Sequence, residues 1–198
     1  MGPARPSLAV GRALVFWLAL AVIAGLADLP PRLLQPPLPP ALVAALTLMI
    51  LTVAWTSVWF REWLGALDVR ALVLVHVTRF VAGFWFLVLY RRGALPYAFA
   101  VPGGIGDMLV ALLAIPVVLA IDARATRRRG LVAAWNALGL VDILMVVATA
   151  GRIGLADPVS MAPLLELPLV LLPTFLVPII IATHVIIFVR LARRPDPA

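Results

Sequence analysis

The chain contains 198 residues, of which 64% are hydrophobic and 13% are charged, whereas soluble domains carry about 25% charged residues. This composition excludes an ordinary water-soluble globule. The absence of cysteine excludes disulfide frameworks, thiol redox chemistry and iron–sulfur or cysteine-ligated zinc sites. A net charge of +7 would suggest nucleic acid in a soluble protein, but here it reflects loop arginines, and we expect no nucleic-acid partner.

Apolar segments of about twenty residues account for most of the sequence, and each is long enough to cross a hydrocarbon layer of about 30 Å as a helix. Lipid offers no partners to backbone N–H and C=O groups, which favours helices over open strands. The predicted spans are residues 8–27, 41–60, 69–90, 97–121, 131–150 and 164–191. The sequence therefore predicts an all-α integral membrane protein in which residues 1–198 form one bundle of six transmembrane helices in the lipid bilayer.

The segments outside these spans are short. Residues 1–27 also resemble a cleavable signal peptide, because arginines precede an apolar run that ends in small residues. Residues 28–40 are rich in proline, which predicts a stiff, extended polyproline II loop on the outer side. Residues 192–198 form a short cytoplasmic tail in this interpretation.

Arginine placement predicts the orientation. Eleven arginines flank one side of the predicted spans, four flank the other, and Arg79 lies inside a span, which accounts for all sixteen. The more basic side is cytoplasmic under the positive-inside rule, so both termini are expected in the cytoplasm of a bacterial-type inner membrane. The basic loop with Arg124, Arg127, Arg128 and Arg129 follows from the same rule, and binding of anionic lipid there is an alternative interpretation.

Three charged residues are predicted near the middle of the membrane. Arg79, Asp107 and Asp142 each lie about ten residues from the start of their spans, so a rise of about 1.5 Å per residue places all three about 15–17 Å deep. An arginine between two aspartates neutralises part of the buried charge and leaves one surplus carboxylate, which predicts a substrate or proton site. The alternative is a static ion pair that holds three helices together.

Both histidines of the chain are expected in one leaflet. His76 and His184 lie about 9–10 Å from the cytoplasmic ends of their spans, and Asn136 has a similar depth. These residues predict a polar site on the cytoplasmic side. Two facing imidazoles are also a ligand set for haem b, while simple hydrogen bonding between helices is the alternative. We expect no other metal, because zinc needs more ligands than these two histidines and a nearby arginine opposes a divalent cation.

Proline and glycine interrupt two of the spans. Pro102, Gly103, Gly104 and Gly106 predict a helix that is broken just before Asp107 and forms a mobile wall of the site. A stripe of small residues for close helix packing is the alternative. Prolines 168, 173 and 178 predict that the last span is kinked in its outer half.

No hydrolase, zinc-protease or nucleotide-binding motif occurs in the sequence, which favours a role other than enzyme. The leading hypothesis is a small-solute-binding or proton-coupled transport protein, in which an aspartate carries the proton and Arg79 is the counter-ion. The alternatives are a redox subunit with His76 and His184 as axial ligands of haem b, and a non-catalytic membrane scaffold or assembly factor. Because 198 residues is short for a transporter, a homodimer is also expected.

Overall fold

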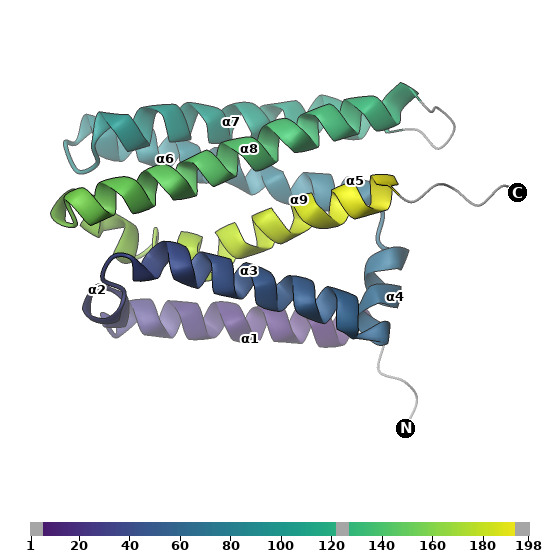
Figure 1. Ribbon diagram of the computed structural model, residues 1–198, viewed down its shortest axis with the longest axis horizontal. Coiled ribbons are helices and arrows are strands. Elements are labelled where there is room, and N and C mark those ends of the chain that lie inside the picture. The colour runs from purple at the N-terminus through teal and green to yellow at the C-terminus, as the bar shows by residue number, and fades with distance from the viewer. Residues whose placement is uncertain (1–5, 122–126, 193–198) are drawn as a thin grey trace, which may run out of the picture. The chain divides into compact units, whose positions relative to one another are not determined.

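Helices make up the computed structural model, which describes residues 6–121 and 127–192 (Figure 1). No strand occurs within these described residues. Six helical segments are long and apolar enough to cross a membrane, and they are Leu8–Leu26, Leu38–Thr56, Val69–Arg91, Tyr97–Ala120, Arg129–Ala156 and Leu172–Ala192. The chain is thus a multi-pass helical membrane protein, as its composition predicts.

The chain divides into two compact units. Unit 1 comprises residues 1–67 and 150–179, and unit 2 comprises residues 68–149 and 180–198. Each unit is made of two stretches of sequence, and the stretches of the two units alternate along the chain. Every predicted polar site residue belongs to unit 2.

Unit 1 begins with two membrane-length helices. Its elements are α1 (Pro6–Leu26), α2 (Leu29–Leu33), α3 (Leu38–Thr56), α4 (Val58–Ala66), the 3₁₀-helix η2 (Val159–Leu165) and the π-helix η3 (Leu172–Leu176). The Trp17 indole on α1 donates a hydrogen bond of 2.9 Å to the carbonyl of Thr174. Its ring also meets Phe175 edge-on, with 5.0 Å between ring centres. These contacts fix α1 against η3.

The proline-rich segment 28–40 is not the extended connection that its composition predicts. Pro30 and Pro31 lie in the first turn of α2, and Pro39 and Pro40 lie in the first turn of α3. The first turn of a helix leaves its N–H groups unpaired, so proline loses no hydrogen bond there and its fixed φ suits the helix. The prolines therefore start helices.

The predicted span 41–60 ends earlier than its hydropathy indicates. Ser57 is extended, with φ −83° and ψ 112°, and its hydroxyl accepts a hydrogen bond of 3.2 Å from the Phe60 N–H. This N-cap ends α3 and starts the separate helix α4. Phe60 and Trp63 pack together on α4, with 5.3 Å between ring centres.

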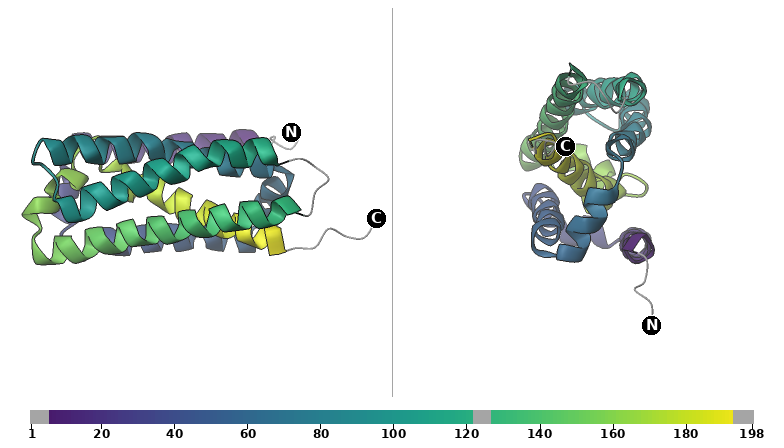
Figure 2. Two further views of the ribbon diagram at one scale, coloured as in Figure 1. Left: turned by 90° about the horizontal axis from the view of Figure 1, so that it is seen from above. Right: turned by 90° about the vertical axis from the view of Figure 1, so that its right-hand side faces the viewer.

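Unit 2 holds the polar residues. Its elements are α5 (Val69–Leu74), the 3₁₀-helix η1 (Val75–Thr78), α6 (Arg79–Arg91), α7 (Tyr97–Ala120) and the larger parts of α8 (Arg127–Ala156) and α9 (Val177–Ala192). Seen end-on, its long helices lie around a common centre (Figure 2, right). Val73, Phe86, Phe99, Val110 and Ile187 are among the buried apolar side chains of this centre.

Glycines bring α6 and α7 into backbone contact. A Cβ atom on Gly104 would lie 2.7 Å from the carbonyl oxygen of Gly83, and a Cβ atom on Gly83 would lie 2.9 Å from the Cβ of Asp107. Only glycine fits such an approach, which is a typical use of small residues between membrane helices. The packing places α6 and α7 close enough for a side chain of one to bond to the other.

The predicted break in the fourth span is wrong, because residues 97–120 form one continuous helix with Pro102 inside it. Pro102 lies near the start of α7 and costs one backbone hydrogen bond. Gly103 and Gly104 are buried against neighbouring helices, so packing outweighs their low helix propensity. The structure has the alternative, a stripe in which Gly103, Asp107, Ala111 and Ala114 are all buried.

The last predicted span, 164–191, is irregular in its outer half. η2 ends at Leu165, turns follow, η3 covers Leu172–Leu176, and α9 starts at Val177. The prolines at 168, 173 and 178 remove backbone donors from this half. The inner half around His184 is a regular α-helix, as expected, while the predicted kink stays a prediction.

Candidate functional site

A change of helix type places His76 and Arg79 on one face. The 3₁₀-helix η1 separates α5 from α6 and contains His76, and Arg79 is the first residue of α6. A 3₁₀-helix has about three residues per turn, so residues i and i+3 align. Both side chains are buried, with 0% of His76 and 2% of Arg79 exposed.

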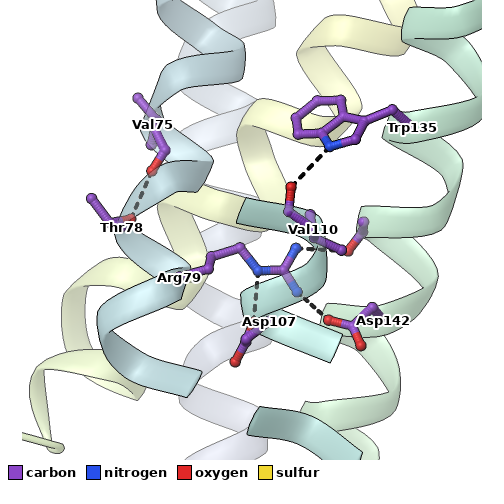
Figure 3. A network of polar contacts seen from close by, with 8 residues as sticks. Val75, Thr78, Arg79, Asp107, Val110, Trp135 and Asp142 are labelled. Carbon is purple, nitrogen blue, oxygen red and sulfur yellow. Dashed lines mark hydrogen bonds and ion pairs between the residues drawn. The ribbon is translucent and has the colours of Figure 1, made fainter. Parts of the chain in front are cut away.

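Arg79 bonds to both predicted aspartates (Figure 3). Its Nε donates to Asp107 Oδ1 on α7 at 2.7 Å, and its Nη2 donates to Asp142 Oδ2 on α8. The remaining Nη1 donates to the carbonyl of Gly139, also on α8, at 3.0 Å. One guanidinium therefore joins three helices, and we call Arg79, Asp107 and Asp142 the ion cluster.

The members of the ion cluster differ in exposure. The side chains of Arg79 and Asp107 are 2% and 4% exposed, whereas the side chain of Asp142 is 19% exposed. Asp142 lines a pocket of about 90 Å³ between α7 and α8, together with Pro102, Gly103 and Thr149. Asp142 is thus the member of the ion cluster with the largest exposed surface.

Each predicted site glycine makes room for a neighbour. A Cβ atom on Gly106 would overlap the carboxylate of Asp142 and lie 2.8 Å from its Cγ. A Cβ atom on Gly103 would lie 3.3 Å from Val146, and Gly104 meets Gly83 as described. The glycines therefore let α7 approach α6 and α8 around Asp107, and they do not interrupt the helix.

The second polar group consists of His76, Asn136 and His184, which the structure also brings together. The imidazole rings of His76 and His184 are in contact, with 4.0 Å between their centres and 42° between their planes. His184 Nδ1 lies 2.8 Å from Asn136 Oδ1, and Asn136 Nδ2 donates to the His184 carbonyl at 2.9 Å. All three residues are completely buried. We call them the histidine cluster.

The two clusters meet at Gly139. Its carbonyl oxygen accepts from Arg79, and a Cβ atom at Gly139 would lie only 2.6 Å from His184 Cε1. Gly139 is therefore the contact between the ion cluster and the histidine cluster. Residues 136, 139 and 142 follow one another at intervals of three on α8, which places them near one helix face.

A haem b with His76 and His184 as axial ligands does not fit this arrangement. Two iron–nitrogen bonds of about 2.0 Å each hold imidazoles on opposite sides of a flat macrocycle, whereas these rings touch each other at 4.0 Å. Trp135 closes the same space, with its ring centre 5.1 Å from His76 and 5.8 Å from His184. No slot for a macrocycle lies between the rings.

Sequence reasoning missed three residues that contact these clusters. Trp135 is 4% exposed and donates to the carbonyl of Val110 at 3.0 Å. Thr183 Oγ1 lies 3.3 Å from His76 Nε2, and Gly139 links the clusters. Trp135 directly precedes Asn136 in the sequence, and Thr183 directly precedes His184. This adjacency is the signal from which both contacts could have been predicted.

The basic loop is described only in part. Arg124 and the side chains of Arg127 and Arg128 lie outside the described residues. Arg129 donates a hydrogen bond to the carbonyl of Leu191 near the end of α9. A cation at this position satisfies a terminal helix carbonyl.

The fold and site define a multi-pass helical membrane protein with a buried polar centre in one of its two units. Residues 36–192 match the model of a family described as "Domain of unknown function (DUF8737)". This match covers more than half of the chain and includes both clusters, so the chain belongs to that family. No curated protein and no solved structure matches the chain.

Proposed function

We propose that this protein binds a small solute, or couples the passage of a solute to protons, at Asp142. The observation that carries the proposal is the composition of the ion cluster. One arginine is bonded to two aspartates, and of these aspartates Asp142 lines a pocket. An excess carboxylate beside a pocket is a group that can exchange a proton or a small cation.

The size and charge of the pocket support a small cationic ligand. A pocket of about 90 Å³ has room for water or for an ion of few atoms, because a cavity needs about 10–15 Å³ to hold one water. Arg79 uses Nε, Nη1 and Nη2 for bonds within the chain, which suits a counter-ion better than a clamp for an anion. The surplus negative charge therefore favours a proton or a cation of few atoms.

The histidine cluster extends the proposed path toward the cytoplasm. Gly139 contacts both Arg79 and His184, so the two clusters form a continuous polar interior within unit 2. The bias of the arginines supports an inner-membrane protein of bacterial type with both termini in the cytoplasm. A homodimer and anionic lipid at the basic loop around Arg124, Arg127, Arg128 and Arg129 belong to the same proposal.

Proton uptake into liposomes tests this function. The purified protein is reconstituted with an internal pH-sensitive dye, and a potassium gradient with valinomycin imposes a negative interior. Wild-type protein should acidify the lumen faster than protein-free liposomes. Asp142→Asn should reduce the rate to that of protein-free liposomes, because it removes the carboxylate that lines the pocket.

Asp28→Asn is the matched control, because it also removes one negative charge. Asp28 forms an exposed ion pair of 3.4 Å with Arg32, and its variant should retain the wild-type rate. Size-exclusion chromatography verifies that each variant is folded. Wild-type liposomes that behave like protein-free liposomes would contradict proton coupling and favour the scaffold alternative, in which the ion cluster only joins the helices.

A further inference from the structure

The pocket at Asp142 is elongated, with a polar side chain at each end of its α8 wall. That wall is formed by Asp142, Met145, Val146 and Thr149, which lie at positions i, i+3, i+4 and i+7 of one helix face. Thr149 follows Asp142 by seven residues, which separates the two by about 10 Å along the helix. One small ion cannot contact both ends, so the whole pocket suits a longer ligand.

The other wall of the pocket is the start of α7, where one carbonyl group lacks its helical donor. Pro102 has no N–H, so the carbonyl of Ala98 loses the hydrogen bond that an α-helix normally supplies from four residues later. Both residues line the pocket. Ala98 is the second residue of the span Tyr97–Ala120, near a membrane interface, whereas Asp142 is predicted at mid-depth. The pocket therefore leads from the interface toward the ion cluster.

Part of the pocket is open to the outside of unit 2. Met145 is 61% exposed, and Ala98 and Pro102 are exposed as well. Both α7 and α8 contain membrane-length spans, and the hydrocarbon core surrounds such helices over about 30 Å. A ligand in this pocket can therefore extend an apolar group into the bilayer.

The ion cluster gives the deep end of the pocket an unbalanced negative charge. Its one arginine (+1) and two aspartates (−2) sum to −1. Arg79 Nη2 donates to one oxygen of Asp142 (Figure 3), and a carboxylate offers about four lone-pair sites, so Asp142 can accept from a further donor. Because an unbalanced charge at this depth is costly, a cation with an N–H group is the favoured partner.

We propose that the pocket binds an amphipathic alkylammonium ion, with its ammonium group at Asp142 and its alkyl chain against Phe99 and Met145. This inference rests on the proposed function, because it names the class of solute for the same carboxylate. The pocket of about 90 Å³ is smaller than the about 300–1,000 Å³ that encloses a drug-sized ligand. It therefore holds the ammonium group and the first part of the chain, while the rest of the chain stays in lipid.

Methyl nuclear magnetic resonance of the whole protein in lipid nanodiscs tests this inference. The protein is labelled with ¹³C-methyl methionine, of which the chain contains five, and the Met145 signal is assigned with Met145→Leu. The probe is hexylamine, which is hexylammonium at neutral pH because an alkylamine such as that of lysine has a pKa of about 10.4. It should shift the Met145 signal in a saturable way. Met49 on α3 is 50% exposed and should report only non-saturable partition into the lipid.

Two related ligands separate the charge from the chain. Hexan-1-ol retains the chain without the charge, and methylammonium retains the charge without the chain. Each should bind at least about tenfold more weakly than hexylammonium, because each loses either the charge-assisted hydrogen bond or the apolar contacts. This comparison uses the wild-type protein, so it does not depend on the folding of any variant.

A pair of aspartate variants locates the cation. Asp142→Asn should weaken hexylammonium binding at least about tenfold, whereas Asp28→Asn, which alters an exposed ion pair, should bind like the wild type. The inference is wrong if the Met145 shift does not saturate, if hexan-1-ol or methylammonium binds as tightly as hexylammonium, or if Asp142→Asn is folded and binds as well as Asp28→Asn.

These measurements are independent of proton uptake, because they need no pH gradient. Saturable binding of hexylammonium by a wild-type protein that does not acidify liposomes would support the ligand class and contradict proton coupling. Proton uptake that depends on Asp142, without a saturable shift of Met145, would overturn the ligand class and support proton coupling. The two proposals therefore fail separately.

Discussion

Arg79 makes the contacts that join α6, α7 and α8 within unit 2. Arg79→Met leaves two carboxylates without their cation, and removal of one partner from a buried ion pair costs about 3–5 kcal/mol. Arg79→Lys should recover little of this loss, because an ammonium cannot reproduce the fork of a guanidinium. Unfolding of detergent-solubilised protein by added SDS measures the difference.

Arg32→Met is the control for Arg79. The side chains of Arg32 and Asp28, which form an ion pair, are 69% and 62% exposed. Exposed ion pairs contribute about 0–1 kcal/mol to stability. If Arg79→Met were as stable as the wild type, burial of Asp107 and Asp142 would not require the Arg79 cation.

Gly106 is the residue on which the position of Asp142 depends. Its Cβ would lie 2.8 Å from Asp142 Cγ, so Gly106→Ala should push the carboxylate away from Arg79. Overpacking of this kind costs about 1–3 kcal/mol, and proton uptake should fall toward that of Asp142→Asn. Thermal unfolding and the liposome assay measure the two effects.

Gly130→Ala is the matched substitution on α8, where an added Cβ meets no described atom within 4 Å. It should preserve activity and slightly raise stability, because alanine favours a helix by up to about 1 kcal/mol over glycine. If both glycine variants behave alike, steric contact with Asp142 is not the reason for glycine at 106.

The boundary between α3 and α4 depends on one hydroxyl. Ser57→Ala removes the acceptor for the Phe60 N–H, and loss of an N-cap costs about 0.5–2 kcal/mol. Hydrogen exchange in the first turn of α4 should accelerate, while exchange in the middle of α3 should not change. Ser57→Thr retains the oxygen and should protect α4 almost as well; equal exchange in all three proteins would rule out the cap.

Several elements were predictable, and their exact ends were not. Span length follows from apolar runs, which explains why the predicted spans 69–90 and 97–121 agree with the helical segments Val69–Arg91 and Tyr97–Ala120. A hydropathy profile does not reveal an N-cap, so the predicted span 41–60 runs across the boundary between α3 and α4. The sequence predicts an extended loop at Pro30 and a broken helix at Pro102, yet both prolines lie inside helices, because the cost of proline depends on its place in the helix.

The orientation of the whole molecule can be tested cleanly, because the chain contains no cysteine. Val159→Cys places a thiol at an 82% exposed position on the predicted outer side, and Ala66→Cys places one at an exposed position on the predicted cytoplasmic side. An impermeant maleimide should label intact spheroplasts at position 159 immediately and at position 66 only after lysis. The reverse pattern would place both termini outside.

At the scale of the molecule, the sequence by itself determined the class and the number of membrane-length helices, and it predicted equal depths for the charged residues. These properties depend on composition and on the fixed rise of a helix, so they need no knowledge of neighbours. Equal depth predicted that Arg79 meets Asp107 and Asp142, and that His76 meets His184.

Only the tertiary structure decided how these groups face one another. It showed that Gly139 joins the clusters, that Asp142 rather than Asp107 reaches a pocket, and that the histidine rings touch with no room for haem. Helix rotation and the contacts between helices determine these relations, and both depend on the side chains of several helices packed together. A pattern within one helix does not contain that information.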